Sequence, residues 1–246
     1  MSTIPAMPSI GDQHIVKSYD DELKRLHDAL TRMAGLAEQQ LGLAIDALEK
    51  RDSDIASRVI NDDIKVDECE HFIGEQTVRV LALRSPMADD LRLVISVLKA
   101  AGDLERIADH AANAAKRSLV LNHMPTVAPM RSLVRMGRLV SELLREVMDA
   151  FLAHDAERAL TVRSRDQEVD DLYSSLFREI LTYMMEDPRT ITACTHLMFI
   201  AKNIERVGDH ATNIAEMTYF LSTGRSLNDT RPKRDTSTLE GATDRP

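Results

Sequence analysis

The chain has little of the residues that form sheets, sharp turns or large aromatic cores. Its 246 residues contain no Trp, nine Gly and eight Pro, and only 4% are aromatic. The abundant Ala, Leu, Met, Glu and Arg are residues that lose little side-chain freedom in a helix. Because 43% of the residues are hydrophobic, there is enough apolar surface for a core. The composition therefore predicts an all-α protein.

Cysteines, apolar runs and excess positive charge are also scarce. Cys69 and Cys194 are isolated, which argues against a disulfide framework or a thiolate metal site and favours reduced thiols. No basic segment followed by an apolar run opens the chain, and no apolar run approaches about 18 residues. We therefore expect a cytoplasmic protein that meets membranes only through partners. A formal net charge of −9 argues against nucleic-acid binding.

Turn signals divide the chain into six predicted helices. Between these signals, apolar residues recur at steps of three and four, which predicts one buried stripe per helix. Ser85 and Asp187 are predicted N-caps, each followed by a proline at the first helical position. Long helices joined by short turns must pack antiparallel. The predicted helices span residues 12–51, 53–84, 87–122, 130–153, 156–186 and 189–222.

An internal repeat relates the two halves of the chain. Residues 103–115 read DLERIADHAANAA, and residues 203–215 read NIERVGDHATNIA, at an offset of 100. Upstream, Asp63 and Asp67 recur as Asp166 and Asp170 at an offset of 103. A repeat of this length indicates a duplicated domain. We predict two tandem antiparallel three-helix bundles, at residues 12–123 and 128–222, and a disordered polar tail at 223–246.

The third helix of each repeat carries an acidic stripe. Glu105, Asp109 and Asn113 are spaced four residues apart, so they lie along one helical face. The apolar stripe lies well away from them, so we expect the acids to face solvent or a groove. Arg106 and His110 lie on the adjacent stripe of the same predicted helix. The second copy repeats the pattern with Glu205, Asp209 and Asn213, and with Arg206 and His210.

Each predicted hairpin brings carboxylates to matched heights. Asp67 and Glu105 are equidistant from Pro86, and so are Asp63 and Asp109. In the second hairpin the corresponding pairs are Asp170 with Glu205 and Asp166 with Asp209. Helix axes about 8 to 10 Å apart would let facing acids share an ion. The pattern predicts a metal site in each half, with candidate ions Fe, Mn, Mg, Ca and Zn; the all-oxygen ligands favour the harder ions.

Plainer interpretations of these residues stay open. Acidic pairs four residues apart are common on solvated helix faces. Arg106 and Arg206 could pair with the acids or with a partner protein, and His110 and His210 could be phosphotransfer residues, although ion-paired histidines are more common. Glu68 and His71 form one Glu-x-x-His motif, but the second copy has Asp171 and Ser174 there. No phosphate-cradling glycine loop, nucleophile elbow or Cys/His pair is present in the sequence.

With the duplicated E-R-x-x-D-H-x-x-N-x-A string, the chain resembles the PhoU family of phosphate-specific transport regulators. The resemblance covers roughly residues 15–222 and rests on four segments in the same order and repeat phase. These segments are 90–95 (DLRLVI), 103–109 (DLERIAD), 183–189 (YMMEDPR) and 203–209 (NIERVGD). The sequence departs from its own repeat in having Ala108 where the second motif has Gly208.

The resemblance implies a cytoplasmic, often dimeric, non-enzymatic adaptor. Such a protein would act between the ATPase subunit of a Pst-type phosphate ABC transporter and a PhoR-type sensor histidine kinase, and would restrain phosphate uptake and starvation signalling. The family's acidic motifs, associated with metal in some members, map onto Glu105 with Asp109 and Glu205 with Asp209. Candidate partner-contacting residues are Arg106, His110, Asn113, Arg206, His210 and Asn213. A carboxylate-cluster enzyme and a metal store are the alternative functions.

Overall fold

The computed structural model describes residues 10–227, with side chains described from residue 18 onward. In this part of the chain every regular element is helical, which confirms the predicted all-α class. The elements are α1 (Ile10–Lys50), α2 (Ser53–Asp62), α3 (Ile64–Arg84), α4 (Ala88–Leu121), α5 (Met130–Leu152), α6 (Ala156–Glu186), a 3-10 helix η1 (Pro188–Thr190) and α7 (Ile191–Thr223).

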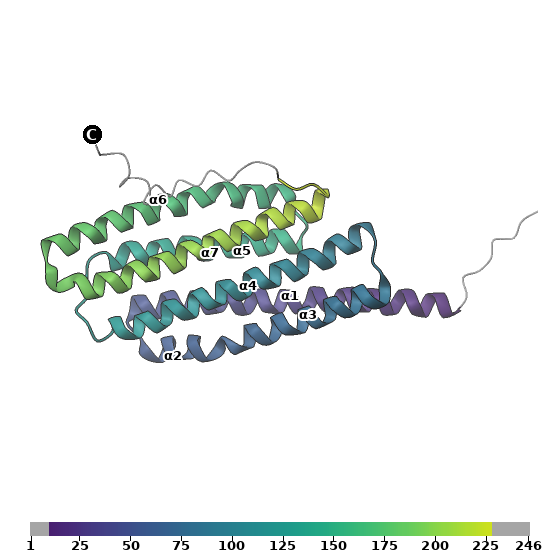
Figure 1. The fold of residues 1–246 in the computed structure, drawn as a ribbon, viewed down its shortest axis with the longest axis horizontal. Helices are drawn as coiled ribbons and strands as arrows, with labels where there is room; N and C mark the ends of the chain where they lie inside the picture. Colours follow the sequence, from purple (N-terminus) through teal and green to yellow (C-terminus); the bar gives the residue numbers. More distant parts are fainter. Residues whose placement is uncertain (1–9, 228–246) are drawn as a thin grey trace, which may run out of the picture.

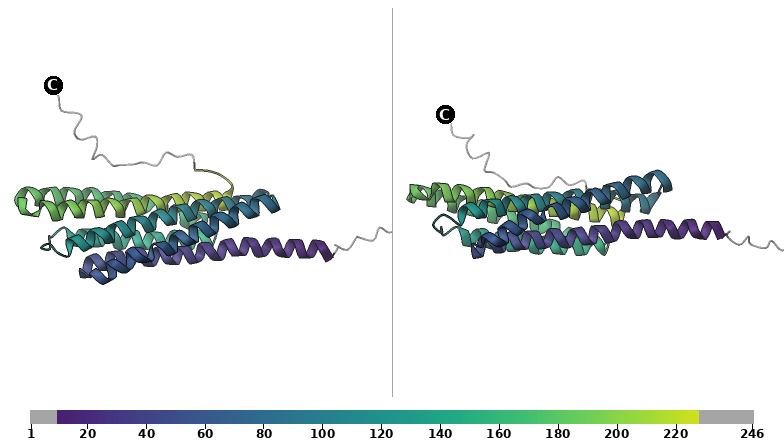
Figure 2. Two further views of the ribbon diagram at one scale, coloured as in Figure 1. Left: turned by 60° about the horizontal axis from the view of Figure 1, so that its bottom comes forward. Right: turned by 90° about the horizontal axis from the view of Figure 1, so that it is seen from below.

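The helices form two tandem bundles that share one long axis. Helices α1 to α4 make the first repeat, and α5 to α7 make the second. Helices α6, α7, α4 and α3 lie side by side in a front layer, with α1 and α5 behind them (Figure 1). Helix α4 packs most extensively against α7, so the equivalent third helices of the two repeats form the central seam (Figure 2).

The core follows from the apolar stripes. It is continuous across both repeats and includes Leu104 and Ile107 of α4, Phe151 of α5, and Ile204 and Val207 of α7, all almost completely buried. Small side chains let helices approach closely at the seam. Helix α4 buries Ala100, Ala101, Ala108, Ala111, Ala112, Ala114 and Ala115.

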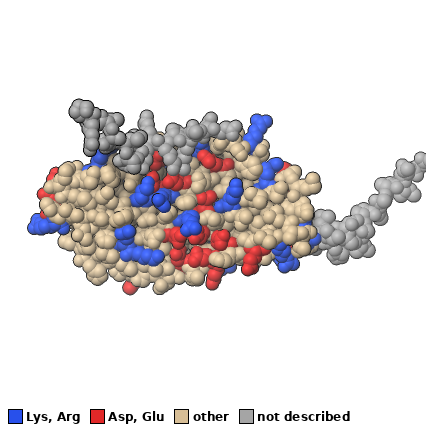
Figure 3. Space-filling view, viewed as in Figure 1, with Lys and Arg blue, Asp and Glu red and all other residues tan. Residues whose placement is uncertain are grey.

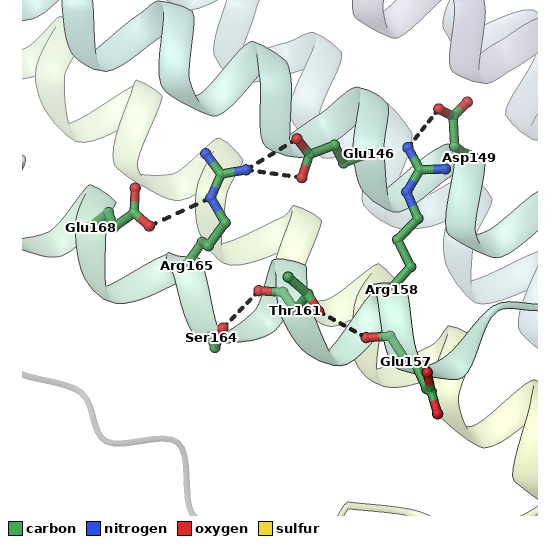
Figure 4. A network of polar contacts seen from close by, with 8 residues as sticks. All are labelled: Glu146, Asp149, Glu157, Arg158, Thr161, Ser164, Arg165 and Glu168. Carbon is green, nitrogen blue, oxygen red and sulfur yellow. Dashed lines mark hydrogen bonds and ion pairs between the residues drawn. The ribbon is translucent and has the colours of Figure 1, made fainter.

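Ion pairs line the outer side of the second repeat. Arg165 donates from Nη1 to Glu146 Oε2 at 2.9 Å and approaches Glu168 at 3.5 Å, while Arg158 reaches Asp149 at 2.9 Å (Figure 4). The contacts with Glu146 and Asp149 join α6 to α5 and help to set the orientation of the hairpin, whereas the contact with Glu168 lies within α6. Because the side chains are partly exposed, each pair contributes at most about 1 kcal/mol.

The predicted helix over 53–84 is interrupted, so that prediction was wrong at one point. Helix α2 ends at Asp62 and α3 begins at Ile64, although Asp63 keeps helical dihedral angles of φ −54° and ψ −42°. Gln40 of α1 donates from Nε2 to the Asp63 carboxylate at 2.8 Å and more weakly to the Val59 carbonyl at 3.4 Å. A side chain that competes for a helical carbonyl weakens the backbone ladder there. The second repeat has Leu143 in place of Gln40, and α6 runs unbroken.

The predicted cap at Ser85 was also wrong. Ser85 ends α3 in the left-handed conformation (φ 47°, ψ 56°), and α4 begins later, after Met87. The helical region is disfavoured for a residue that precedes proline, which explains why Ser85 does not continue either helix. Asp187 does act as a cap. Its side chain accepts the Arg189 N–H at 3.1 Å, but it starts η1, and α7 begins at Ile191.

The C-terminal end of α7 lies close to α4. Gly224 caps α7 with φ 71°, and its N–H donates to the Phe220 carbonyl at 2.8 Å. A Cβ atom at Gly224 would lie 3.5 Å from the Arg92 guanidinium. Residues 228–246 of the predicted tail lie outside the described residues. Among the described helices, none combines the length and apolar character needed to cross a membrane.

Candidate functional site

Two histidines meet at the centre of the α4–α7 seam. The ring centroids of His110 and His210 are 5.7 Å apart. His110 Nδ1 lies 3.0 Å from Asn203 Oδ1, and His210 Nδ1 lies 2.7 Å from Asp103 Oδ1. Asp103 and Asn203 are equivalent positions of the two repeats, 100 residues apart. Each histidine therefore bonds the equivalent residue of the opposite repeat. The seam therefore has an approximate local two-fold symmetry.

The symmetry is broken by one charge. Asp103 accepts bonds from His210 and, at 3.1 Å, from Asn213 Nδ2, whereas the equivalent Asn203 is neutral. Burial lowers the pKa of His110, the bond to Asn203 opposes this, and the nearby His210 and Arg206 lower it further. Apolar residues of α1, such as Leu41 and Ala44, border His110. The two histidines therefore occupy equivalent positions in the two repeats but have different electrostatic environments.

Acidification below the ordinary histidine pKa is expected to weaken the seam through His110. A lowered folded-state pKa means that the unfolded chain binds more protons, so stability falls as pH drops below about 6.5. We expect His110→Gln to remove part of this loss, on the order of 1 kcal/mol, between pH 7.5 and 5.5 in urea unfolding. His123→Gln, in an exposed loop, is the control. An identical pH dependence in all three proteins would contradict this assignment.

The first acidic cluster comprises Asp63, Asp67, Glu105 and Asp109, and the structure brings its members together. Burial raises the pKa of Asp63, and the charges of Asp67 and Asp109 raise it further against the Gln40 hydrogen bond. Burial also raises the pKa of Glu105, followed by the charge of Asp109. The matched heights predicted from hairpin counting therefore correspond to carboxylates close enough to repel one another.

Arg106 supplies the positive charge beside this cluster. Its Nε lies 3.2 Å from Glu105 Oε2, and its Nη1 lies 3.1 Å from Asp109 Oδ2. The Arg106 side chain is 60% exposed, so these contacts are open to solvent and weak. The ion-pair interpretation of Arg106 thus holds in the first repeat.

The second acidic cluster comprises Asp166, Asp170, Glu205 and Asp209, and it is less exposed than predicted. Glu205 is only 7% exposed, so the expectation that all the acids face solvent or a groove was wrong for this residue. Lys202 Nζ contacts Glu205 Oε1 at 2.8 Å, and Thr212 donates to Asp166 Oδ1 at 3.1 Å. Asp170 and Asp209 are half-buried. On the side of the molecule seen in Figure 1, acidic side chains gather near the middle, with basic side chains among and around them (Figure 3).

In the structure, the acidic side chains are not arranged as a set of metal ligands. Among the described residues, no group of three or more His, Cys, Asp or Glu is arranged to hold a metal ion. His71, from the lone Glu-x-x-His motif, is exposed and its Nδ1 bonds the Asp67 carbonyl at 2.9 Å. The carboxylate oxygens suit hard cations chemically, but their positions would have to adjust. Metal binding by the two clusters therefore stays a prediction.

Sequence reasoning missed the polar partners of these residues. The contacts of Gln40 with Asp63 and of His110 with Asn203 join side chains far apart in the chain. The one available signal was the repeat itself, because positions 103 and 203 match inside the aligned motif while differing in charge. Three candidates are exposed, Asn113, Arg206 and Asn213; Asn213 bonds Asp103 across the seam, and Arg206 lies near enough to His110 to lower its pKa.

The chain is similar to known proteins along nearly its whole length. The PhoU domain profile matches residues 30–118 and 133–218, one domain in each repeat. A phosphate-specific transport system accessory protein PhoU homolog from Caulobacter vibrioides is 50% identical, covering 91% of this chain and 97% of the relative. The homolog of the same description from Rhizobium meliloti is 46% identical, covering 94% and 98%.

Solved structures agree with these matches. The crystal structure of PhoU from Pseudomonas aeruginosa has a TM-score of 0.82 and 39% identity, covering 84% of this chain and all of that one. The phosphate transport system regulatory protein PhoU from Streptococcus pneumoniae has a TM-score of 0.79 and 31% identity, covering 86% and 100%. Both repeats and the fold thus match, and the chain belongs to the PhoU family of phosphate transport accessory proteins.

Proposed function

We propose that this protein is a cytoplasmic negative regulator of phosphate uptake and phosphate-starvation signalling. It acts as a non-enzymatic, homodimeric adaptor between the ATPase subunit of a phosphate ABC transporter and a PhoR-type sensor histidine kinase. The observation that carries the proposal is 50% identity across 97% of a phosphate-specific transport system accessory protein homolog. That similarity includes both repeats, so the proposal concerns the whole two-bundle unit.

The seam offers a surface for such contacts. Arg206, Asn113 and Asn213 are exposed, and Arg206 is in no ion pair with another residue between 18 and 227. By contrast, Arg106 is engaged by Glu105 and Asp109, and the two histidines bond across the seam. We therefore assign partner contact first to Arg206 and the two asparagines. His110 and His210 would act by fixing the geometry beneath them.

Loss of the protein is expected to release phosphate control. Deleting the gene should leave phosphate uptake and a starvation-gene reporter active in phosphate-replete medium, with wild-type chain restoring repression. Arg206→Glu should bind the transporter ATPase subunit and the kinase less well in pull-downs, while Arg131→Glu, on the exposed start of α5, should behave as wild type. Normal repression in the deletion strain, without a paralogue, would refute the proposed role.

We also propose that the acidic clusters bind a hard cation, with Arg106 as the internal competitor in the first repeat. Glu105→Gln with Asp109→Asn should reduce Mn²⁺ bound after dialysis, because two carboxylate ligands are lost. Arg106→Gln should increase it, because the charge paired with both acids is removed. Elemental analysis of the purified proteins measures both effects. Equal metal content in wild type and the carboxylate variant would eliminate the site.

A further inference from the structure

A groove of about 600 Å³ opens between α4 and α7 where α7 nears its end. Its apolar lining includes Ile95 of α4, Met217 and Phe220 of α7, and Leu227 beyond it. Lys99 and Arg106 of α4 add two cations to the same lining. The volume lies within the range of about 300 to 1,000 Å³ that is typical of small-molecule sites.

The duplication supplies an internal comparison for this groove. At the repeat offset of 100, Lys99 corresponds to Phe199, and Met217 corresponds to Arg117. At that equivalent place the Arg117 guanidinium carbon lies 4.0 Å from the centre of the Phe199 ring. A guanidinium over an aromatic face is an attractive cation–π contact, and it joins the walls of α4 and α7. The Arg117–Phe199 contact thus bridges α4 and α7 at one of the two equivalent places, whereas Met217 and Lys99 stand at these positions in the other.

One cation in the open groove, Lys99, is free to meet an anion. Asp103 is engaged by His210 and Asn213, and Glu216 is paired with Arg163 at 3.0 Å. Lys99 is exposed and, among the residues from 18 to 227, has no carboxylate partner. Both lining carboxylates therefore already have partners within the protein, whereas the Lys99 ammonium has none among the described residues. Ser96 adds a hydroxyl at the floor that is 1% exposed and makes no hydrogen bond within the described part of the chain.

We propose that this groove binds an amphipathic organic anion, with the anionic group at Lys99 and the apolar group against Met217 and Phe220. The occupant replaces the internal closure that Arg117 and Phe199 provide in the other repeat. Such a site would let a small ligand bridge α4 and α7 across the seam. The inference is independent of the adaptor role, because it depends only on the groove and its equivalent.

The probe is 8-anilinonaphthalene-1-sulfonate, and N-phenyl-1-naphthylamine, which has the same rings without the sulfonate, is the matched control. Isothermal titration calorimetry on the full chain should show about tenfold tighter binding of the sulfonate, because it gains the attraction of Lys99. Lys99→Gln should remove most of that difference. Equal affinity for the two probes in wild type would overturn the proposal.

Exchanging the closing residues tests the location of the site. Lys99→Phe with Met217→Arg should rebuild the closure and abolish sulfonate binding at the groove. Phe199→Lys with Arg117→Met should open the equivalent place and add a second binding event. Circular dichroism and urea unfolding check that each protein is folded, and Lys99→Gln decides the outcome if an exchange variant is not. Unchanged affinity and stoichiometry in the folded closure variant would disprove the assignment.

Discussion

Replacing Gly137 with leucine is expected to destabilise the protein by about 3 kcal/mol, the cost of overfilling a packed core. Gly137 is a buried residue of α5. A Cβ atom there would lie 2.9 Å from both Cγ1 and Cδ1 of Ile45 in α1, and 3.5 Å from Ile204 Cδ1 in α7. Even a Cβ atom would require Ile45 to shift, and the remaining atoms of a leucine side chain would have to be fitted between α5 and its neighbours α1 and α7. Because α1 belongs to the first repeat and α5 to the second, the junction between the repeats should be affected most.

A second glycine provides the control for this prediction. A Cβ atom at Gly42 of α1 would have no neighbouring atom within 4 Å, so Gly42→Ala should stabilise the protein by about 0.5 to 1 kcal/mol through helix propensity. Gly137→Ala should fall between the two, because Ile45 can shift in part. Urea unfolding monitored by circular dichroism measures all three free energies. A Gly137→Leu protein as stable as wild type would show that the α1–α5 junction is loosely packed.

The fold could be predicted because its causes are local and repeated. Steps of three and four between apolar residues define each helix, and the Pro188 turn marks the second hairpin. The matching motifs at 103–115 and 203–215 then require two similar bundles. Equal distances from the turn at Pro86 predicted that Asp63 and Asp67 lie beside Asp109 and Glu105. In the structure, repulsion between these carboxylates contributes to the raised pKa values of Asp63 and Glu105.

The remaining features depend on tertiary contacts that periodicity does not encode. The break at Asp63 needs Gln40, which comes from another helix. The burial of Glu205 depends on how α7 packs in the finished bundle, where Lys202 offsets its charge. The bond from His210 to Asp103 depends on the crossing of α4 and α7, which the spacing within either helix does not specify.

The two repeats differ in chemistry at equivalent positions of the seam. Asp103 and Asn203 give one charged and one neutral histidine contact at the seam. Lys99 lines the groove, whereas the equivalent Phe199 is covered by the Arg117 guanidinium. The aligned apolar residues, such as Leu104 and Ile204, are buried in both repeats. The two repeats therefore share the packing that defines the fold but differ at the seam, and this asymmetry is compatible with the adaptor role proposed above.

A buried ion pair at the far end of the first bundle should dominate the response to strong acid. Arg84, at the end of α3, donates from Nε to Glu22 Oε2 at 2.8 Å and from Nη2 to Oε1 at 3.0 Å, and Glu22 is only 7% exposed. The Arg84 guanidinium lowers the pKa of Glu22 against the opposing effect of burial. Two parallel bonds from one guanidinium fix the carboxylate, so the pair ties the N-terminal part of α1 to α3.

Glu22→Gln is therefore expected to cost about 2 kcal/mol at pH 7, because Arg84 loses its charged partner in a mostly buried place. A carboxyl whose folded pKa is lowered stabilises the folded state above its unfolded pKa, and that contribution is lost as pH falls through the folded pKa. The difference between wild type and variant should thus shrink below about pH 4. Glu49→Gln, which breaks an exposed 2.7 Å pair with Arg138, should cost under about 1 kcal/mol. Equal losses for the two variants, or a Glu22→Gln loss that persists in acid, would assign the contact to packing rather than to charge.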